Sequence, residues 1–153
     1  MIREANKSDI DAIIDLWQEL MDFHIERSDL YQMKPDAREI YSEYLNDVLK
    51  SPDYIPLVFE NKNQILGYLI ATESNDPPVY EGTAGLILEL SITEKYRNKG
   101  IGEELVSGIE KYFQNKGINR IECMVSNFNE ISKAFWSKNG YNTYNIMCVK
   151  LLD

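Results

Sequence analysis

The stretch that decides the fold is KYRNKGIGEEL, residues 95–105, where three basic residues alternate with other residues and two glycines follow. The preceding TAGLILELSI, residues 83–92, has the apolar composition of a strand. Apolar residues then recur at helical spacing from Ile101 to Phe113. The pattern predicts a strand, a glycine turn and a helix N-terminus in succession. The first helical N–H groups have no partner within the helix, so this turn is predicted to bind an anion such as a phosphate.

Two common nucleotide-binding motifs do not fit this turn. GIGEEL, residues 100–105, departs from the G-x-G-x-x-G fingerprint because Leu105 stands where the third glycine belongs. The P-loop pattern with its Lys-Ser/Thr ending is also absent from the sequence. A glycine turn before a helix is common, so its surroundings must identify it.

Charge and composition exclude several classes of protein. The chain has 153 residues, which predicts one domain over residues 1–153, and its net charge is −9. Residues 1–60 carry 14 acidic and 6 basic side chains, so nucleic acid is not an expected partner. No apolar run is long enough to span a membrane, and the N-terminal MIREANKSDID lacks an apolar signal region. A cytoplasmic protein without a membrane partner is therefore expected.

Cysteine and histidine usage favours no metal site. Cys123 and Cys148 both lie in apolar, strand-like segments and are predicted to be buried free thiols. His24 is the only histidine in the chain, so a metal ion would lack ligands.

The pass along the chain predicts an α+β fold, with helices packed on a mostly antiparallel sheet. Ser8 is the predicted N-cap of the first helix, and Gly117 suits the position after the third. The predicted elements, in order, are a strand in IREA, a helix in KSDIDAIIDLWQELMDFHI, a helix over residues 36–49, strands in YIPLVFE and QILGYLIAT, a turn-rich loop in SNDPPVYEG, a strand in TAGLILELSI, a helix over residues 100–115, a strand in NRIECMV, a helix in NEISKAFWSKNG, and a last strand or hairpin in YNTYNIMCVKLL.

Taken together, these segments resemble the GCN-five-related N-acetyltransferases (GNAT). LSITEKYRNKGIGEELV is similar to the acetyl-CoA signature of that family, Arg/Gln-x-x-Gly-x-Gly/Ala, at Arg97, Gly100 and Gly102. NFNEISKAFWSKNGY resembles the family's second cofactor segment, and IREANKSDIDAIIDLW resembles its usual N-terminus. The resemblance covers essentially the whole chain. It implies a mixed, mostly antiparallel central sheet with about four flanking helices and a splayed strand pair at the cofactor site.

The resemblance also implies how acetyl-CoA, the cosubstrate, would lie. Its pyrophosphate would meet backbone N–H groups of the glycine turn, and its pantetheine would run along the strand end before it, with the second segment beside the thiol. The implied cofactor-binding residues are Leu90, Ser91, Ile92, Arg97, Asn98, Lys99, Gly100, Ile101, Gly102, Glu103, Asn129, Ser132, Phe135 and Trp136.

Glu89 is the candidate general base, since amine acetylation requires an ammonium group to lose a proton. Period-two alternation places it opposite Leu88 and Leu90, and partial burial would raise its pKa. The alternatives are a surface glutamate or a water chain. The resemblance implies a tyrosine acid at position 136, where this chain has Trp136, and an indole N–H is not a usable acid. Tyr141 is the candidate acid; otherwise Tyr144 or water helps, or the thiolate leaves unassisted.

The acidic N-terminal part is predicted to shape the acceptor site, as the resemblance implies. Its charges and tyrosines suit a cationic amine, although a solvated helix pair explains most of them without a ligand. The candidate substrate-binding residues are His24, Glu26 and Tyr31, with a half-buried structural histidine as the default for His24. The sequence therefore predicts an acetyl-CoA-dependent N-acetyltransferase that acts on a primary amine, preferably of a small cationic molecule, by direct attack in a ternary complex. A protein or peptide N-acetyltransferase and a non-catalytic CoA-binding sensor are the alternatives, and a homodimer is possible.

Overall fold

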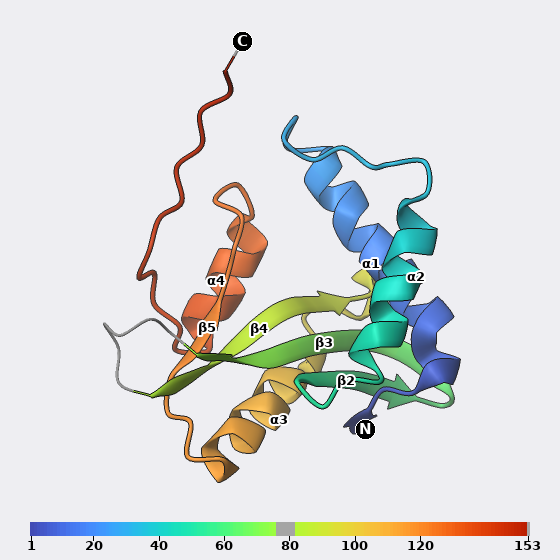
Figure 1. The fold of residues 1–153 in the computed structure, drawn as a ribbon, viewed down its shortest axis with the longest axis vertical. Helices are drawn as coiled ribbons and strands as arrows, with labels where there is room; N and C mark the ends of the chain where they lie inside the picture. Colours follow the sequence, from blue (N-terminus) through green and yellow to red (C-terminus); the bar gives the residue numbers. More distant parts are fainter. Residues whose placement is uncertain (76–81, 153) are drawn as a thin grey trace.

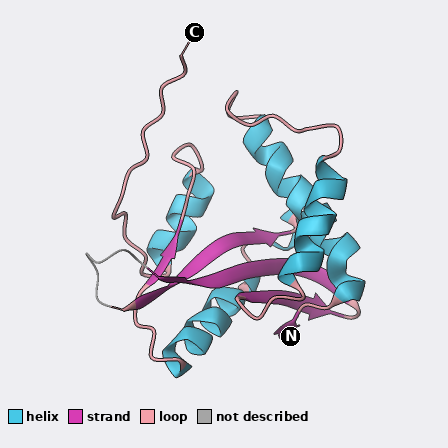
Figure 2. Ribbon diagram, in the orientation of Figure 1, coloured by secondary structure: helices cyan, strands magenta, loops and turns pink. Residues whose placement is uncertain are grey.

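A computed structural model describes residues 1–75 and 82–152, so most of the predicted turn-rich loop SNDPPVYEG lies outside the described residues. The described residues form an α+β fold, as predicted, with helices packed on one mostly antiparallel sheet (Figure 1, Figure 2). None of the helices in this part of the chain is long and apolar enough to cross a bilayer. The elements are β1 Ile2–Glu4, the 3-10 helix η1 Lys7–Asp9, α1 Ile10–Ile25, α2 Ala37–Val48, β2 Tyr54–Asn61, β3 Gln64–Asn75, β4 Thr83–Ile92, the 3-10 helix η2 Glu94–Tyr96, α3 Ile101–Asn115, β5 Ile121–Cys123 and α4 Glu130–Lys138.

The sheet has the order β1-β2-β3-β4-β5, with antiparallel pairs from β1 to β4 and a parallel pair of β4 with β5. Helices α1 and α2 cover one face, and α3 covers the other (Figure 1). Side chains alternate between the two faces as the pleat requires. On β3, for example, Tyr68 packs under α1 and α2, while Leu69 packs against α3.

One interruption of this alternation positions the site. Ile70 pairs with Glu89 and Ala71 pairs with Ile87, so Leu88 is the extra residue of a β-bulge in β4. Strict alternation from Ile87 would direct Glu89 into the core beneath α3. The bulge instead turns Glu89 toward α1 and α2.

The bulge also marks the point where β4 separates from β5. These strands pair over only three residues of each strand, from Gly85 to Ile87 on β4. Beyond Ile87, β4 continues to Ile92, and within residues 1–75 and 82–152 it pairs there with β3 alone. This is the splayed strand pair that the resemblance implied.

The first helix begins differently from the prediction. The chain enters α1 through the 3-10 helix η1, whose N-cap is Asn6, and Asp9 rather than Ser8 stands at the N-cap of α1. The Asn6 Oδ1 accepts a hydrogen bond from the Ser8 N–H at 2.9 Å. Asp9 completes a capping box by accepting from the Asn6 N–H at 2.8 Å. The buried Asp9 carboxylate also pairs with both terminal nitrogens of Arg3, at 2.7 and 2.8 Å. The capping residue therefore also ties α1 to β1.

Two predictions for the C-terminal segment are wrong. Residues 142–152 form no strand or hairpin in the structure, and Cys148 is exposed instead of buried. The apolar pattern meets the side-chain requirement of a strand. A strand also needs a neighbour for its backbone groups, and none lies along this segment in the described residues.

The Arg3–Asp9 pair generates a stability prediction. Asp9→Ala should lower the free energy of unfolding by about 2–3 kcal/mol, because it removes the buried one of the two carboxylates that pair with Arg3, leaving Glu60, and it removes a cap. The Arg3 hydrogen bonds lower the pKa of Asp9 below its usual value of 3.8. The difference from wild type should therefore hold above about pH 4 and shrink as the pH falls below it. Urea unfolding at several pH values measures this.

The matched control is Asp11→Ala in the first turn of α1, where the side chain is exposed. It should change the free energy of unfolding by less than about 0.5 kcal/mol. If the two variants lost equal free energy of unfolding, the effect of Asp9→Ala would come from the loss of a negative charge near the start of α1 and not from the pair with Arg3.

Candidate active site

The glycine turn between β4 and α3 is built from two residues with left-handed backbone. Asn98 has a φ of 58° and Gly100, the N-cap of α3, has a φ of 83°. A Cβ on Gly100 would meet no atom within 4 Å, so the conformation, and not a lack of space, requires glycine here. The turn thus presents the first N–H groups of α3 beside open space, as an anion site requires.

Gly102 has a different task from Gly100. A Cβ at Gly102 would lie 2.9 Å from Cε2 of Phe135 on α4. The glycine therefore lets α3 and α4 approach closely. Phe135 in turn contacts the buried Trp136 with nearly perpendicular rings, 5.1 Å between centroids.

The basic residues of the turn are only partly available to a ligand. Arg97 donates from Nε to the Ile92 carbonyl at 3.0 Å, which ties the turn to the end of β4. The Lys99 ammonium lies over the Tyr96 ring, 4.5 Å from its centroid, and is exposed. Lys95 is exposed as well. Basic side chains therefore lie near the N-terminus of α3, but none of these three is described as bonded to its N–H groups.

Two acidic residues also lie in the first turn of α3. Glu103 pairs with Lys138 of α4 at 3.0 Å, and this partner lowers the pKa of the Glu103 carboxyl. A carboxylate here stabilises the helix dipole but repels an anion. Lys138 offsets that repulsion.

The strand end before the turn offers backbone groups. Leu90 and Ile92 pack their side chains toward α3, and Ser91 points the opposite way. The buried Ser91 hydroxyl donates to the Leu16 carbonyl of α1 at 3.1 Å. These three predicted cofactor residues can therefore meet a ligand chiefly through the main chain, on the side where β5 has diverged.

The second predicted cofactor segment forms α4 and its cap. Asn129 is buried, and its Oδ1 accepts from the Ser132 N–H at 3.0 Å, which caps the helix. Trp136 is buried in the core shared with α3. Asn129, Ser132 and Trp136 thus have structural tasks, and their contacts with a cofactor stay predictions.

Glu89 lies between two tyrosine hydroxyls. Its Oε2 accepts hydrogen bonds from Tyr41 of α2 at 2.6 Å and from Tyr68 of β3 at 2.7 Å. Burial raises the pKa of Glu89 above its usual value, and the two phenol hydrogen bonds partly oppose that rise. Trp17 of α1 stacks on Tyr41 with 4.2 Å between ring centroids, which orients the phenol.

Tyr68 is a residue that sequence reasoning missed. It is fully buried within a strand, and its hydroxyl is directed to Glu89 and Tyr41. The signal for it in the sequence is a phenol in the otherwise apolar segment ILGYLIA, residues 65–71, because a buried hydroxyl needs a partner. Tyr41 belongs to the acidic, tyrosine-bearing N-terminal part, but only the tertiary structure pairs it with Glu89.

His24 and Tyr31 lie together against a loop from the distant C-terminal part of the chain. The His24 ring centroid is 4.8 Å from that of Tyr31 and 5.6 Å from that of Phe128. The Tyr31 and Ser126 hydroxyls are hydrogen-bonded at 2.9 Å. His24 is buried, with Nδ1 2.7 Å from the Leu20 carbonyl, so a neutral ring would carry its proton on Nδ1. The end of α1 is thus joined to the loop before α4.

The remaining predicted residues lie apart from this group. Glu26 is exposed and pairs with Arg27 at 3.1 Å. Tyr141 donates its hydroxyl to Glu110 in the C-terminal half of α3, at 3.2 Å. Burial and Glu110 raise the pKa of Tyr141 above its ordinary value. This placement argues against Tyr141 as the acid that protonates a thiolate.

Comparison with known sequences identifies the family. A sequence profile of the acetyltransferase (GNAT) family matches residues 13–141. The chain belongs to the acetyltransferase (GNAT) family. It is therefore an N-acetyltransferase, with the acetyl-CoA cosubstrate of that family.

Individual GNAT proteins resemble this one over almost the whole chain. Acetyltransferase ECA0875 of Pectobacterium atrosepticum is 28% identical over 150 residues, covering 98% of this chain and 92% of that protein. The tetramutant of BH1408 from Bacillus halodurans has a TM-score of 0.89 at 22% identity, covering 99% of each chain. Aminoglycoside N-acetyltransferase AAC(6')-Iy, solved in complex with CoA, has a TM-score of 0.75 at 15% identity, covering 100% of this chain and 99% of that one. The structural likeness shows the shared GNAT fold.

The left-handed Gly100 generates a binding prediction. Gly100→Ala should weaken acetyl-CoA binding roughly tenfold or more, about 1.4 kcal/mol, because the methyl group strains the turn that directs the α3 N–H groups. Isothermal titration measures the affinity.

Gly117 provides the matched control at the other end of α3. It also has a positive φ, 76°, and a methyl group there would meet no atom within 4 Å. Gly117→Ala should lose comparable stability, about 1 kcal/mol, while retaining acetyl-CoA affinity. If both variants bound acetyl-CoA as tightly as wild type, the assignment of the anion site to this turn would be wrong.

Proposed function

We propose that this GNAT protein acetylates a primary amine of a small cationic molecule, with the amine attacking directly while both substrates are bound. The observation that carries the proposal is the position of Glu89. It lies at the bulge where β4 leaves β5, on the same strand segment that leads to the anion-binding turn. A proton acceptor and an acetyl-donor site thus share one strand.

The residues of the glycine turn and strand end fit acetyl-CoA. The diphosphate is proposed to bind next to the N–H groups of α3; the left-handed Gly100, where a Cβ would meet no atom within 4 Å, and the nearby charge of Lys99 support this. The free side of β4 from Leu88 to Ile92 offers strand-like backbone pairing to the pantetheine amides. When bound, acetyl-CoA supplies the activated acetyl group. The Ile92 N–H is the proposed donor to the carbonyl oxygen of that group as negative charge develops.

Glu89 is the proposed general base. Both phenols bind the same carboxylate oxygen, Oε2, so Oε1 is the oxygen proposed to accept the proton of the ammonium group. Burial raises the pKa of Glu89 above its usual value, the direction that a general base requires, and the hydrogen bonds from the two phenols partly oppose that rise. Tyr41 and Tyr68 act as positioning residues, because they hold the carboxylate and touch no substrate in this proposal.

The leaving thiolate is proposed to depart without a tyrosine acid. Trp136 is buried in the α3–α4 core, and Tyr141 is bonded to Glu110. An ordinary thiol has a pKa of about 8.5, so its thiolate is a tolerable leaving group near neutral pH and can be protonated by water.

The acceptor is proposed to lie between α1, α2 and the loop before α4. This side of the sheet carries most of the acidic excess of residues 1–60, which attracts a cation. His24, Tyr31 and Phe128 form an aromatic cluster at one end of this proposed acceptor region. Aromatic rings of this kind attract the ammonium group of a cationic amine. Structural neighbours that are named aminoglycoside N-acetyltransferases support a small amine-bearing acceptor.

Two alternatives make different predictions for the same assay. A protein or peptide N-acetyltransferase would prefer peptide amines over small polyamines. A CoA-binding sensor, which the buried Trp136 in the usual tyrosine position suggests, would bind acetyl-CoA without releasing CoA. The test is release of the CoA thiol from acetyl-CoA with polyamines, aminoglycosides, amino acids and short peptides. Release with a cationic small molecule supports the proposal, and saturable binding without release in any class contradicts it.

Replacing the carboxylate tests its role as base. Glu89→Gln should lower kcat/KM by roughly 10²–10⁴-fold, with little change in acetyl-CoA affinity. Wild-type kcat/KM should fall on the acidic side of a pKa that lies above the usual 4.5 of a glutamate, and this limb should be absent in the variant. Glu73→Gln, on the neighbouring β3 and paired with Lys116, is the control and should behave as wild type. An unchanged pH profile in Glu89→Gln would exclude Glu89 as the base.

Removing either phenol should shift the acidic limb of the pH dependence of kcat/KM. The hydrogen bonds from Tyr41 and Tyr68 lower the pKa of Glu89, so Tyr41→Phe or Tyr68→Phe should raise it. We expect the limb to move by about one pH unit to higher pH. Tyr44→Phe is the control, since its ring lies 5.6 Å from that of Tyr41 but its hydroxyl does not bond Glu89 among the described contacts. A limb that stays in place in both test variants would show that the phenols serve packing only.

A further inference from the structure

The gap between β4 and β5 has residues of the two strands at matching levels on its two sides. The strands separate beyond Ile87 and Cys123, their last paired residues. Leu90 of β4 and Val125, two residues past the end of β5, both pack toward α3. They stay level with each other because the extra residue of the bulge in β4 offsets the count by one. The position after each of them therefore points to the other side of the sheet, toward α1.

These next positions are two serines, and their hydrogen bonds agree with the side they are expected to face. Ser91 donates its hydroxyl hydrogen to the Leu16 carbonyl of α1 at 3.1 Å. The Ser126 hydroxyl lies 2.9 Å from that of Tyr31, in the segment that follows α1. One serine thus stands on each side of the gap. Ser91 is engaged by the helix above it, whereas Ser126 is paired with another hydroxyl.

Helix α1 passes over the gap from one strand to the other. Leu16 receives the bond from Ser91 of β4, and the His24 ring lies 5.6 Å from that of Phe128 in the loop after β5. Eight residues of α-helix span about 12 Å along the axis. Two strands that admit one extended chain between them lie about 10 Å apart, which is twice the usual spacing. The span of α1 therefore agrees with room for one extended chain, the place proposed above for the pantetheine.

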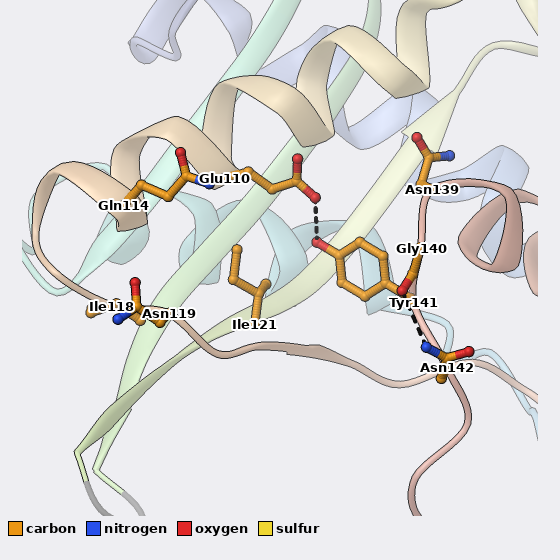
Figure 3. A pocket seen from close by; sticks show the side chains of 9 residues that line it. All are labelled: Glu110, Gln114, Ile118, Asn119, Ile121, Asn139, Gly140, Tyr141 and Asn142. Atoms are coloured by element: carbon orange, nitrogen blue, oxygen red, sulfur yellow. Dashed lines mark hydrogen bonds between the residues drawn. The ribbon is translucent and has the colours of Figure 1, made fainter.

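The phenol that sequence analysis favoured as an acid lies on the other side of the sheet. Tyr141 is directed at Glu110 of α3, beside a cavity of about 360 Å³ (Figure 3). In Figure 1 the end of α1 and the loop that joins β5 to α4 extend away from α3, on the opposite side of the sheet. The Tyr31–Ser126 pair joins these two segments. It therefore shares the side of the sheet that Glu89 faces.

We propose that the Ser126 hydroxyl donates a hydrogen bond to the sulfur of acetyl-CoA as the acetyl group leaves it, and that Tyr31 is the positioning residue for this serine. The inference rests on the proposed function, which sets the acetyl carbonyl at the Ile92 N–H, next to the position that Ser126 faces. A serine hydroxyl has one hydrogen to donate and lone pairs that accept. Tyr31, whose phenol is a stronger donor than an alcohol, donates to Ser126 Oγ and leaves the serine hydrogen for the ligand.

The hydrogen bond acts on the step in which the thiolate departs. After the amine nitrogen has bonded to the acetyl carbon, the carbon–sulfur bond breaks and both of its electrons go to the sulfur. A donor at the sulfur stabilises the thiolate more than the uncharged thioester, so it lowers the barrier. Water then supplies the proton that the thiolate takes up, and Glu89 releases to water the proton taken from the ammonium group. Ser126 thus assists departure in a chain whose Trp136 is buried in the core with α3.

The thiol of bound CoA tests this hydrogen bond without any acceptor amine. CoA that carries carbon-13 next to its sulfur is bound to the protein, and its NMR chemical shift is followed with pH to give the thiol pKa, which is about 8.5 for an ordinary thiol. Ser126→Ala should raise the pKa of the bound thiol by about 0.5–1 pH unit relative to wild type, the effect of one lost hydrogen bond to the thiolate. Tyr31→Phe, which keeps the aromatic ring, should raise it by a smaller amount.

Two exposed or distant hydroxyls provide matched controls for these variants. Ser137→Ala removes an exposed hydroxyl from α4, and Tyr112→Phe removes a phenol from α3, where the ring contacts Phe113 and Lys116. Both should leave the pKa of the bound CoA thiol as in wild type. Ser126→Thr keeps a hydroxyl at the site and should also retain the wild-type value, so a change in Ser126→Ala alone would come from the hydroxyl and not from altered packing.

Steady-state rates then separate assistance to departure from binding. With acetyl-CoA and the most active amine of the CoA-release panel, Ser126→Ala should lower kcat roughly 10–100-fold, as expected for one hydrogen bond to a charged group, with little change in the KM for acetyl-CoA. Ser126→Thr should recover most of that loss.

The two readouts distinguish failure of this inference from failure of the proposed function. An equal pKa of the bound thiol in wild type and Ser126→Ala overturns the inference, whether or not an amine is acetylated. A raised thiol pKa with an unchanged kcat overturns the role in departure. A raised thiol pKa in a protein that releases CoA with no amine supports the hydrogen bond and contradicts the proposed function instead.

Discussion

The bulge at Leu88 is the constraint on which the rest of the site depends. Because one extra residue interrupts the β3–β4 ladder, Glu89 faces α1 and α2 instead of the core under α3. At the same point the parallel pairing of β4 with β5 ends. The strand beyond it offers its backbone to a ligand and leads directly into the anion-binding turn. A single irregularity thus places the proposed acceptor side and the proposed cofactor side next to the same strand.

Burial of the Glu89 carboxylate has a cost that the surrounding phenols reduce. A charged group moved out of water is stable only with hydrogen-bond partners, and Tyr41 and Tyr68 supply two of them at 2.6 and 2.7 Å. Tyr41 is fixed by the stack on Trp17, and Tyr68 by complete burial in β3. The position of the proposed base therefore depends on the packing of three elements, α1, α2 and β3.

Much of the fold could be predicted from local pattern. Helical spacing and strand composition predict each helix and each strand of the sheet, and Arg97, Gly100 and Gly102 point to the anion-binding turn. The prediction of Ser8 as the N-cap of the first helix is wrong because a 3-10 turn capped by Asn6 precedes α1, and the contacts of Asp9 with Asn6 and Arg3 fix where each helix begins. The strand predicted at the C-terminus is absent for a related reason. Composition describes what a segment can bury, while strand formation depends on a neighbouring edge.

The sequence by itself determined the fold class, the family and the turn that suits a phosphate, because these follow from residue patterns within single segments and from the order of those segments along the chain. Only the tertiary structure decided that Tyr68 and Tyr41 meet Glu89, that Tyr31 reaches Ser126 across 95 positions, and that Gly102 serves the contact with Phe135. The physical reason is that these contacts join distant segments whose approach depends on sheet register and helix packing. The residue pattern of one segment does not indicate which other segment will pack against it.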